Sequence, residues 1–249
     1  MLKIENVVLP SEEQWKAIIR GMRNPKNSWD KSDSGPGCYF DSGKVELCEN
    51  CKSDLYCHSS EYVLGPNDHD LMMNLRNAGT DHRKFMRMTV VYLDITAPLY
   101  WWKEYDTYKV GTVANSCSTM HKIHDKEFTL DDFSCEHLKN FNGFRNIPHG
   151  REIALFENGF RMTIADLNTA RKLYLQTGDK RYWWQMIQLL PSSYNQKRTV
   201  MLNYEVLANM YKSRRNHKLD EWHTFCDWVE SLPYSELITG KVKDDCHRI

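Results

Sequence analysis

The chain has no excess of charge of either sign and no long apolar run. Lysine plus arginine and aspartate plus glutamate each total 33, so the formal net charge is zero. Proteins that bind nucleic acid polymers or anionic membrane surfaces usually carry a clustered basic excess, so we expect neither partner. No apolar stretch approaches the roughly 18–20 residues that a membrane-spanning helix needs, so we expect no membrane association.

Internal repeats, low-complexity tracts and a secretory signal are also missing. The opening sequence MLKIENVVLP has only a short apolar piece followed at once by acidic residues, whereas a signal peptide needs a longer apolar core. We therefore expect a cytoplasmic protein. In a reducing compartment its eight cysteines would be thiols or metal ligands rather than disulfides.

The composition is that of an ordinary globular protein, with 41% apolar and 27% charged residues over 249 positions. No clean domain boundary is visible, so we interpret 1–249 as one mixed α/β (α+β) domain with a helix-rich C-terminal half. The segment Phe85–Ile95 predicts a strand that is apolar on both faces, which indicates a central place in a sheet. Periodicity predicts helices from Ser11 to Arg23 and over Asn67–Asn77, Pro98–Tyr108, Thr163–Thr177, Asp179–Leu190, Thr199–Asn216 and Asp220–Ser231.

The start of the first of these helices carries the strongest local signal. Ser11 and Gln14 have the spacing of a capping box. We expect Asn67 to cap the second helix. The apolar face of the first helix consists of Trp15, Ile18, Ile19 and Met22.

Residues 24–66 contain a cysteine cluster within a stretch of little periodicity, which we interpret as a loop insertion. A C-x2-C turn places two thiolates on one metal ion, and two more distant cysteines would complete a tetrahedral structural zinc site. Free or redox-active thiols are the alternative, because the spacing C-x9-C-x2-C-x5-C matches no standard zinc finger closely. The four residues are Cys38, Cys48, Cys51 and Cys57.

The segment 98–121, PLYWWKEYDTYKVGTVANSCSTMH, combines aromatic rings with lysines, small hydroxyls, an amide and a thiol. Aromatic rings offer stacking faces, and lysine and hydroxyl groups donate to phosphates. The mixture is typical of a site for a flat ring that carries an anionic group. Of the adjacent pair Trp101 and Trp102, we expect one to meet an interface or a ligand.

Two further patterns leave alternatives open. Cys117 and His121 are four residues apart, so on a helix they would share a face as a nucleophile and its base; otherwise Cys117 is a small packed residue. Near the C-terminus, Asn203, Asn209 and Arg214 form a polar stripe. It is either a solvated helix face or the edge of a ligand site whose guanidinium binds phosphate.

Over residues 80–230 these pieces together resemble the flavin-dependent thymidylate synthases. That family has a histidine before a strand, a Pro-led aromatic helix with Arg-Gln, and the signature R-H-R-x-x-S-x-N-E-x-S-x-R-Y. Later it has Leu-Pro and a helix with two asparagines and an arginine. The similar positions here are His82, Pro98, Lys103–Glu104, Thr107–Tyr108–Lys109, Thr112, Asn115–Ser116–Cys117–Ser118, Met120–His121, Leu190–Pro191, Asn203, Asn209 and Arg214.

This resemblance implies a central, mostly antiparallel sheet flanked by helices, assembled as a homotetramer. It implies FAD as cofactor and reductive methylation of dUMP, with NADPH and methylene-tetrahydrofolate as cosubstrates. It assigns the catalytic positions to Ser118 and Arg214. It assigns flavin binding to His82, Thr107, Tyr108, Lys109, Asn115, Asn203 and Asn209, and dUMP binding to Lys103, Glu104, Ser116, Ser118 and Arg214.

The signature arginines are missing, because Thr107 and Met120 carry no charge and only Lys109 keeps one. A lysine does not replace a bidentate guanidinium, so two alternatives to dUMP methylation stay open. One is a non-catalytic nucleotide- or flavin-binding relative, and the other is a flavoenzyme that modifies a different pyrimidine nucleotide. The cations that we expect to restore the phosphate charge are Arg20, Arg23, Lys26 and Lys31.

Overall fold

The computed structural model describes residues 2–38, 60–142 and 153–241, and its contacts divide the chain into two compact units. Unit 1 contains Met1–Glu5, Asp94–Thr107 and Ala114–Thr199. Unit 2 contains Asn6–Leu93, Tyr108–Val113 and Val200–Ile249. Each unit is thus assembled from three separate stretches of sequence. The interpretation of 1–249 as one domain, with 24–66 as an insertion, stays a prediction.

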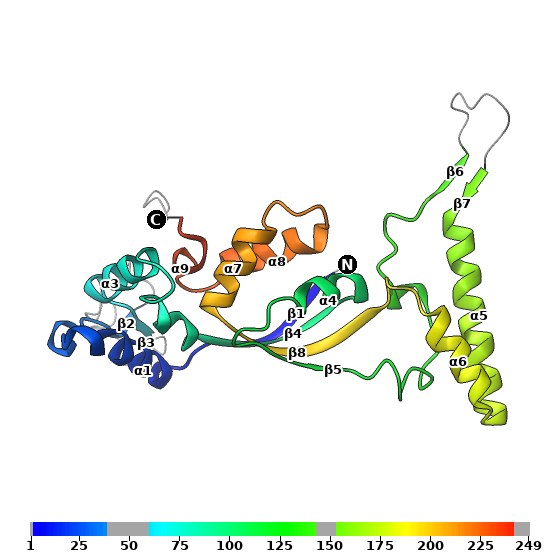
Figure 1. Cartoon of the computed structure of the whole chain (residues 1–249), viewed down its shortest axis with the longest axis horizontal. Helices are drawn as coiled ribbons and strands as arrows, with labels where there is room; N and C mark the ends of the chain where they lie inside the picture. The colour runs from blue at the N-terminus through cyan, green and yellow to red at the C-terminus, as the bar shows by residue number, and fades with distance from the viewer. Residues whose placement is uncertain (1, 39–59, 143–152, 242–249) are drawn as a thin grey trace. The chain divides into compact units, whose positions relative to one another are not determined.

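A four-stranded antiparallel sheet has the strand order β1-β4-β8-β5 (Figure 1). Its strands are β1 (Lys3–Val8), β4 (Val90–Pro98), β8 (Asn195–Asn203) and β5 (Val113–Ser116). Two hairpin-like pairs add β2 (Gly35–Cys38) with β3 (Ser60–Val63), and β6 (Asn140–Asn142) with β7 (Ile153–Leu155). The predicted fold class, a mixed α/β fold around a mostly antiparallel sheet, is confirmed.

Strand β4 lies between β1 and β8, as its apolar sequence predicted, but its bounds and its second face differ from the prediction. A short 3-10 helix, η3 (Lys84–Arg87), occupies the first part of the predicted strand. Val91 and Ile95 are fully buried, whereas the side chain of Tyr92 on the opposite face is 46% exposed. Tyrosine tolerates partial exposure, so its presence did not distinguish a strand covered on both faces from one covered on a single face.

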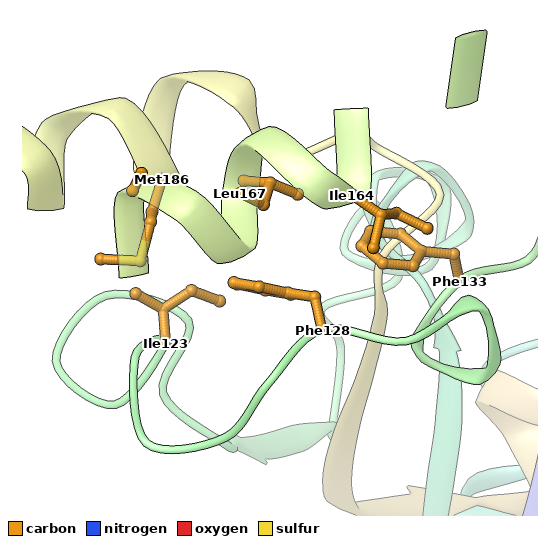
Figure 2. Close-up of a cluster of buried hydrophobic side chains, with 7 residues drawn as sticks. Ile123, Phe128, Phe133, Ile164, Leu167 and Met186 are labelled. Atoms are coloured by element: carbon orange, nitrogen blue, oxygen red, sulfur yellow. The ribbon is translucent and has the colours of Figure 1, made fainter. Parts of the chain in front are cut away.

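Unit 1 contains the helices α4 (Leu99–Tyr105), η4 (Leu130–Asp132), α5 (Phe156–Thr177) and α6 (Lys180–Leu189). Helices α5 and α6 pack side by side (Figure 1). Gly178, with a φ of +67°, makes the turn between them, and the Asp179 carboxylate caps α6 by accepting from the Arg181 N–H. Figure 2 shows the core that this pair covers, formed by Ile123, Phe128, Phe133, Ile164, Leu167 and Met186 together with Ala170.

Unit 2 contains α1 (Glu12–Arg23), η1 (Asn24–Lys26), η2 (Trp29–Lys31), α3 (Pro66–Asn77), α7 (Tyr204–Arg214), α8 (Asp220–Ser231) and α9 (Glu236–Thr239). The predicted capping box of α1 is present, because the Ser11 hydroxyl accepts from the Gln14 N–H and the Gln14 side chain accepts from the Ser11 N–H. The predicted face of α1 is buried, and α8 has the predicted bounds. Helix α7 packs against α8 and α9.

The largest error of the sequence-based prediction is at 199–203, which belongs to strand β8 and not to the following helix. Val200 and Leu202 are buried while Thr199 is exposed, which is strand alternation. Three smaller errors concern helix ends: α4 ends at Tyr105, α5 begins at Phe156, and Gly65 rather than Asn67 precedes α3. Within the described ranges, no helix is both long and apolar enough to cross a membrane.

Candidate functional site

The aromatic helix α4 forms a packed cluster in unit 1. Trp101 and Trp102 are both buried, so the expectation that one of them meets a ligand or an interface is wrong. Both indole rings pack on Tyr105, at centroid distances of 5.3 Å and 4.9 Å. The Arg198 guanidinium lies 4.2 Å from the Trp102 ring and pairs with Asp106. The rings of this cluster are therefore part of the packed core of unit 1.

A cavity of about 270 Å³ lies within unit 1, where the loop after β5 meets β8. The loop is fixed to β8 by two hydrogen bonds: the Cys117 N–H donates to the Lys197 carbonyl at 2.9 Å, and the Gln196 amide donates to the Cys117 carbonyl at 2.8 Å. The Ser118 hydroxyl accepts from the His121 N–H at 2.9 Å, which closes a turn. The cavity is lined by Thr96, Cys117, Ser118, Thr119, Lys126, Asp131, Asp132, Tyr194, Asn195, Gln196 and Lys197.

Two ammonium groups line this unit 1 cavity. Lys126 pairs with Asp132 across the η4 turn, and Lys197 pairs with Asp94 at 3.0 Å. The hydrogen bond to Asp132 raises the pKa of Lys126, and the hydrogen bond to Asp94 raises the pKa of Lys197, so both stay charged at neutral pH. The side chains are 69% and 41% exposed, which leaves their remaining N–H donors accessible to an anion.

In unit 2 the structure brings together Tyr108 and Arg214, which the sequence had assigned to flavin and substrate. The Arg214 Nε donates to the Tyr108 hydroxyl at 2.9 Å. Its guanidinium carbon lies 5.1 Å from the Trp222 ring centroid and 5.6 Å from the Tyr108 ring centroid. Contact with two aromatic rings restricts the direction in which this guanidinium points.

Asn203 is the last residue of β8 and the N-cap of α7. Its side-chain oxygen accepts from the Val206 N–H at 2.9 Å, and its amide nitrogen donates to the Gly111 carbonyl at 3.1 Å. Gly111 has a φ of +71°, and a Cβ placed there would lie 2.4 Å from the Asn203 amide nitrogen. The Asn203 side chain therefore joins the start of α7 to the 108–113 segment, and its predicted contact with a cofactor stays a prediction.

A buried carboxylate that no sequence motif indicated lies on the first turn of α7. Glu205 is 6% exposed and accepts hydrogen bonds from the guanidiniums of Arg83 and Arg87. Burial by itself would raise the pKa of Glu205, but the hydrogen bonds from the two arginines hold it below its usual range. Arg83 also donates to the Asn209 side-chain oxygen at 3.4 Å, so this cluster includes one predicted flavin contact. His82, immediately before Arg83, is exposed.

The predicted site residues therefore fall into two groups. In unit 1, Ser118 lines the cavity, Glu104 is half-buried, and the side chains of Lys103, Thr107, Asn115 and Ser116 are exposed. In unit 2, His82 and Lys109 are exposed, and the other four residues belong to the contacts above. That second group consists of His82, Tyr108, Lys109, Asn203, Asn209 and Arg214.

The structure contradicts the proposed nucleophile geometry, whereas three of the four predicted zinc ligands lie outside the described residues. Residues 117–121 are not helical, so Cys117 and His121 do not share a helix face and the proposed geometry of that pair is wrong. Of the four cysteines, only Cys38, at the end of β2, lies among the described residues; Cys48, Cys51 and Cys57 fall outside them. Among the described residues, no group of three or more His, Cys, Asp or Glu side chains is arranged to hold a metal ion.

No protein-family model and no curated protein sequence matches the chain. Solved structures do match its fold over almost its whole length. Thymidylate Synthase X from Helicobacter pylori, crystallised with FAD and dUMP, has a TM-score of 0.59 at 15% identity, covering 98% of this chain and 100% of that one. A second crystal structure of this flavin-dependent enzyme, also with FAD and dUMP, gives 0.58 at 13% identity, covering 97% and 99%.

The UMP/dUMP methylase PolB from Streptomyces cacaoi, bound with 5-Br dUMP, has a TM-score of 0.53 at 14% identity. The match covers 96% of this chain and 95% of that one. Identities this low support a shared fold and leave the reaction to be argued from the site. The chain thus has the fold of the flavin-dependent thymidylate synthases, in a strongly divergent sequence.

Proposed function

We propose that the chain is a flavin-dependent methylase of a pyrimidine mononucleotide such as dUMP, with FAD as cofactor and NADPH and methylene-tetrahydrofolate as cosubstrates. The observation that supports this best is the unit 1 cavity, because residues 117–119, from the segment that resembles the nucleotide signature, line it. Two structures with the same fold contain FAD and dUMP, and a third belongs to a UMP/dUMP methylase.

The unit 1 cavity carries groups that can contact a mononucleotide. Its volume of about 270 Å³ lies just below the usual range of small-molecule pockets, roughly 300–1,000 Å³, so a dinucleotide is too large for it. Lys126 and Lys197 supply two ammonium groups where the signature arginines are missing. The carboxylates of Asp131 and Asp132 line the same cavity, and each lysine is paired with an aspartate, so the lysines contribute through their remaining N–H donors. The Ser118 hydroxyl and the Asn195 amide add neutral groups of the kind that bind a phosphate and a pyrimidine edge.

The residues of unit 2 fit flavin binding only in part. Tyr108 offers an aromatic ring, and Lys109 and His82 are exposed and able to donate hydrogen bonds. The Asn203 amide, by contrast, already uses its oxygen and one N–H within the fold. When bound, the flavin would supply the hydride chemistry of the methylation, and the protein would hold and orient the rings.

The test is to measure flavin content, dUMP affinity and NADPH oxidation on the purified protein. We expect a bound yellow chromophore after FAD addition, and NADPH oxidation that dUMP accelerates. Lys126→Gln/Lys197→Gln should weaken dUMP binding about ten-fold, through two exposed charge contacts. The matched control Lys122→Gln/Lys172→Gln removes the same charge from exposed sites of unit 1 and should bind dUMP normally. Equal affinity in both double variants would refute the assignment of the cavity.

A non-catalytic nucleotide-binding protein is the second candidate, and the engaged Asn203 amide favours it. It predicts dUMP binding that depends on Lys126 and Lys197, without affinity for FAD and without NADPH oxidation. A third outcome, NADPH oxidation accelerated by another pyrimidine nucleotide but not by dUMP, would identify a different substrate. The homotetramer and the zinc site implied by the sequence are tested on the same sample, by sedimentation equilibrium and by metal analysis.

A further inference from the structure

A second cavity, of about 600 Å³, lies entirely within unit 2, and the proposed methylation does not use it. Its six lining residues come in pairs from three places: the end of α1 with η1, the segment that begins just before η2 and ends with it, and the first turns of α3. Three of the six carry a positive charge and none carries a negative one. The lining residues are Arg23, Lys26, Ser28, Lys31, Asn67 and Leu71.

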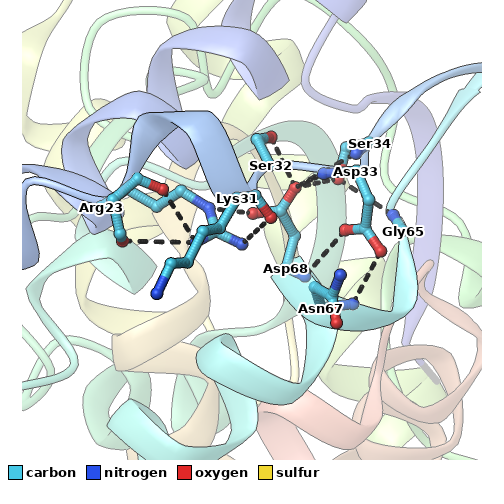
Figure 3. Close-up of polar contacts among 9 residues, drawn as sticks. Arg23, Lys31, Ser32, Asp33, Ser34, Gly65, Asn67 and Asp68 are labelled. Carbon is cyan, nitrogen blue, oxygen red and sulfur yellow. Dashed lines mark hydrogen bonds and ion pairs between the residues drawn. The ribbon is translucent and has the colours of Figure 1, made fainter.

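Arg23 lines this unit 2 cavity, but its charge is already paired within the protein. Its Nε lies 2.5 Å from a carboxylate oxygen of Asp68, and its other nitrogens donate to the Ser28 and Lys31 carbonyls at 3.1 Å and 2.9 Å. The residue is only 3% exposed. Figure 3 shows these bonds holding the η1–η2 turn against α3. The expectation that Arg23 supplies charge to a phosphate is therefore replaced by a structural role.

Asp68 and Asp33 both accept hydrogen bonds from groups within the protein. The second oxygen of Asp68 accepts from the Ser32 and Ser34 hydroxyls at 2.7 Å and 2.6 Å. The two oxygens of Asp33 accept from the Asn67 and Asp68 N–H groups at the start of α3. These carboxylates balance Arg23 and the N-terminal end of the helix dipole, and neither lines the cavity.

Lys26 and Lys31 differ from Arg23 because both are exposed and no ion pair of the described residues involves either one. In Figure 3 the ammonium end of Lys31 extends away from the dashed contacts around Asp68. The two lysines end the short helices η1 and η2, whose connection the Arg23 bonds fix. The cavity thus presents two ammonium groups from a braced turn, beside the Ser28 hydroxyl and the Asn67 amide.

We propose that this unit 2 cavity binds a phosphorylated small molecule of nucleotide size, with its phosphate groups contacted by Lys26 and Lys31. A lysine ammonium group binds phosphate as a point charge. It does not need the planar, bidentate geometry of an arginine guanidinium. The volume of about 600 Å³ falls within the usual range of ligand pockets, so a nucleoside fits in addition to its phosphates. None of the residues that line the unit 1 cavity takes part.

The experiment is calorimetric titration of the full-length protein with inorganic pyrophosphate, with uridine diphosphate and adenosine diphosphate, and with uridine as the probe that lacks phosphate. We expect pyrophosphate and both diphosphates to bind and uridine to bind far more weakly. Lys26→Gln/Lys31→Gln should weaken pyrophosphate binding about ten-fold, through two lost charge contacts, and Lys26→Arg/Lys31→Arg should retain it. Far-UV circular dichroism checks that each variant is folded.

One control separates the two lysines of this unit 2 cavity from other cations. Lys212→Gln/Lys218→Gln removes the same charge from exposed positions of unit 2 and should leave pyrophosphate binding unchanged. Pyrophosphate affinity that falls equally in this control and in Lys26→Gln/Lys31→Gln, or that falls only in Lys126→Gln/Lys197→Gln, overturns the proposal. Uridine binding as tight as that of uridine diphosphate does so as well, because the phosphate would then contribute nothing.

Discussion

Replacing Asn203 with alanine removes two hydrogen bonds of a side chain that is 4% exposed. Loss of the N-cap bond to the Val206 N–H costs about 1 kcal/mol. Loss of the bond to the Gly111 carbonyl costs about 1 kcal/mol more. The sum is a decrease of about 2 kcal/mol in the free energy of unfolding, without any ligand present. The cost belongs to the fold itself, so it is expected whether or not a flavin binds.

The assay is urea denaturation of the ligand-free protein, followed by far-UV circular dichroism. With a denaturant slope of about 3 kcal/mol per molar urea, the midpoint of Asn203→Ala should fall by roughly 0.7 M. Asn203→Ser keeps a capping oxygen and loses the donor to Gly111, so it should recover about half of the loss. Asn209→Ala is the control, because this exposed side chain makes only a 3.4 Å contact with Arg83; it should change the free energy of unfolding by less than about 0.5 kcal/mol. A midpoint for Asn203→Ala equal to that of Asn209→Ala would refute the reasoning.

The same assay tests three further changes. Asp68→Asn should lower the free energy of unfolding by about 3–5 kcal/mol, because it leaves the Arg23 guanidinium buried without its counter-ion. Burial would raise the pKa of Asp68, but bonds from Ser34, Ser32 and Arg23 hold it below its ordinary value of 3.8. The contribution of the carboxylate is therefore present above that value and lost as the pH falls through the lowered pKa, so variant and wild type should converge at acidic pH, below that lowered pKa. A difference that stays constant with pH would contradict the linkage. Gly111→Ala should lower the free energy of unfolding by about 1–2 kcal/mol because of the positive φ and the close Asn203 amide. Gly159→Ala, with open space in α5, should raise the free energy of unfolding by roughly 0.5–1 kcal/mol. Equal effects of the two changes would show that φ at position 111 is not constraining. Leu167→Ala should lose about 2–5 kcal/mol from the unit 1 core, and Leu175→Ala, 54% exposed, less than about 0.5 kcal/mol; similar losses would place the core elsewhere.

Helices whose start or face is encoded locally were predictable from the sequence. Ser11 and Gln14 cap α1 within four residues of each other, and the apolar period of α8 places Trp222 and Phe225 on one buried face. Both signals depend on neighbours along the chain, so no tertiary contact has to be known. The bounds of α8 followed from this periodicity alone.

The strand at 199–203 was not predictable in the same way. Val200 and Leu202 alternate over only a few residues, and the strong helical period from Tyr204 onward dominates any window that contains both. What makes the segment a strand is its pairing between β4 and β5, which lie far away in the sequence. Strand propensity depends on such partners, so a short alternation without a visible partner stays ambiguous.

The candidate site was predictable where it follows the family signature and not elsewhere. Ser118 lines the unit 1 cavity, in the segment that the sequence had singled out. Lys126 and Lys197 also line the cavity but lie outside that signature. Lys126 pairs with Asp132 of η4, and Lys197 lies on β8, the strand that binds the Cys117 loop. Glu205 was also missed, since a glutamate in a first helical turn is usually exposed and only its arginine partners explain its burial.

Two strands of the main sheet pass directly into helices. Pro98 ends β4 and Leu99 begins α4, while Asn203 ends β8 and Tyr204 begins α7. With no residue between the two elements, the rotation of each helix about its axis is tied to the register of its strand. One residue inserted into β8 would reverse which of its side chains face inward and would turn α7 by about 100°. Arg214 and Asn209 would then point in new directions, so this part of the molecule can diverge by substitution far more readily than by a change in length.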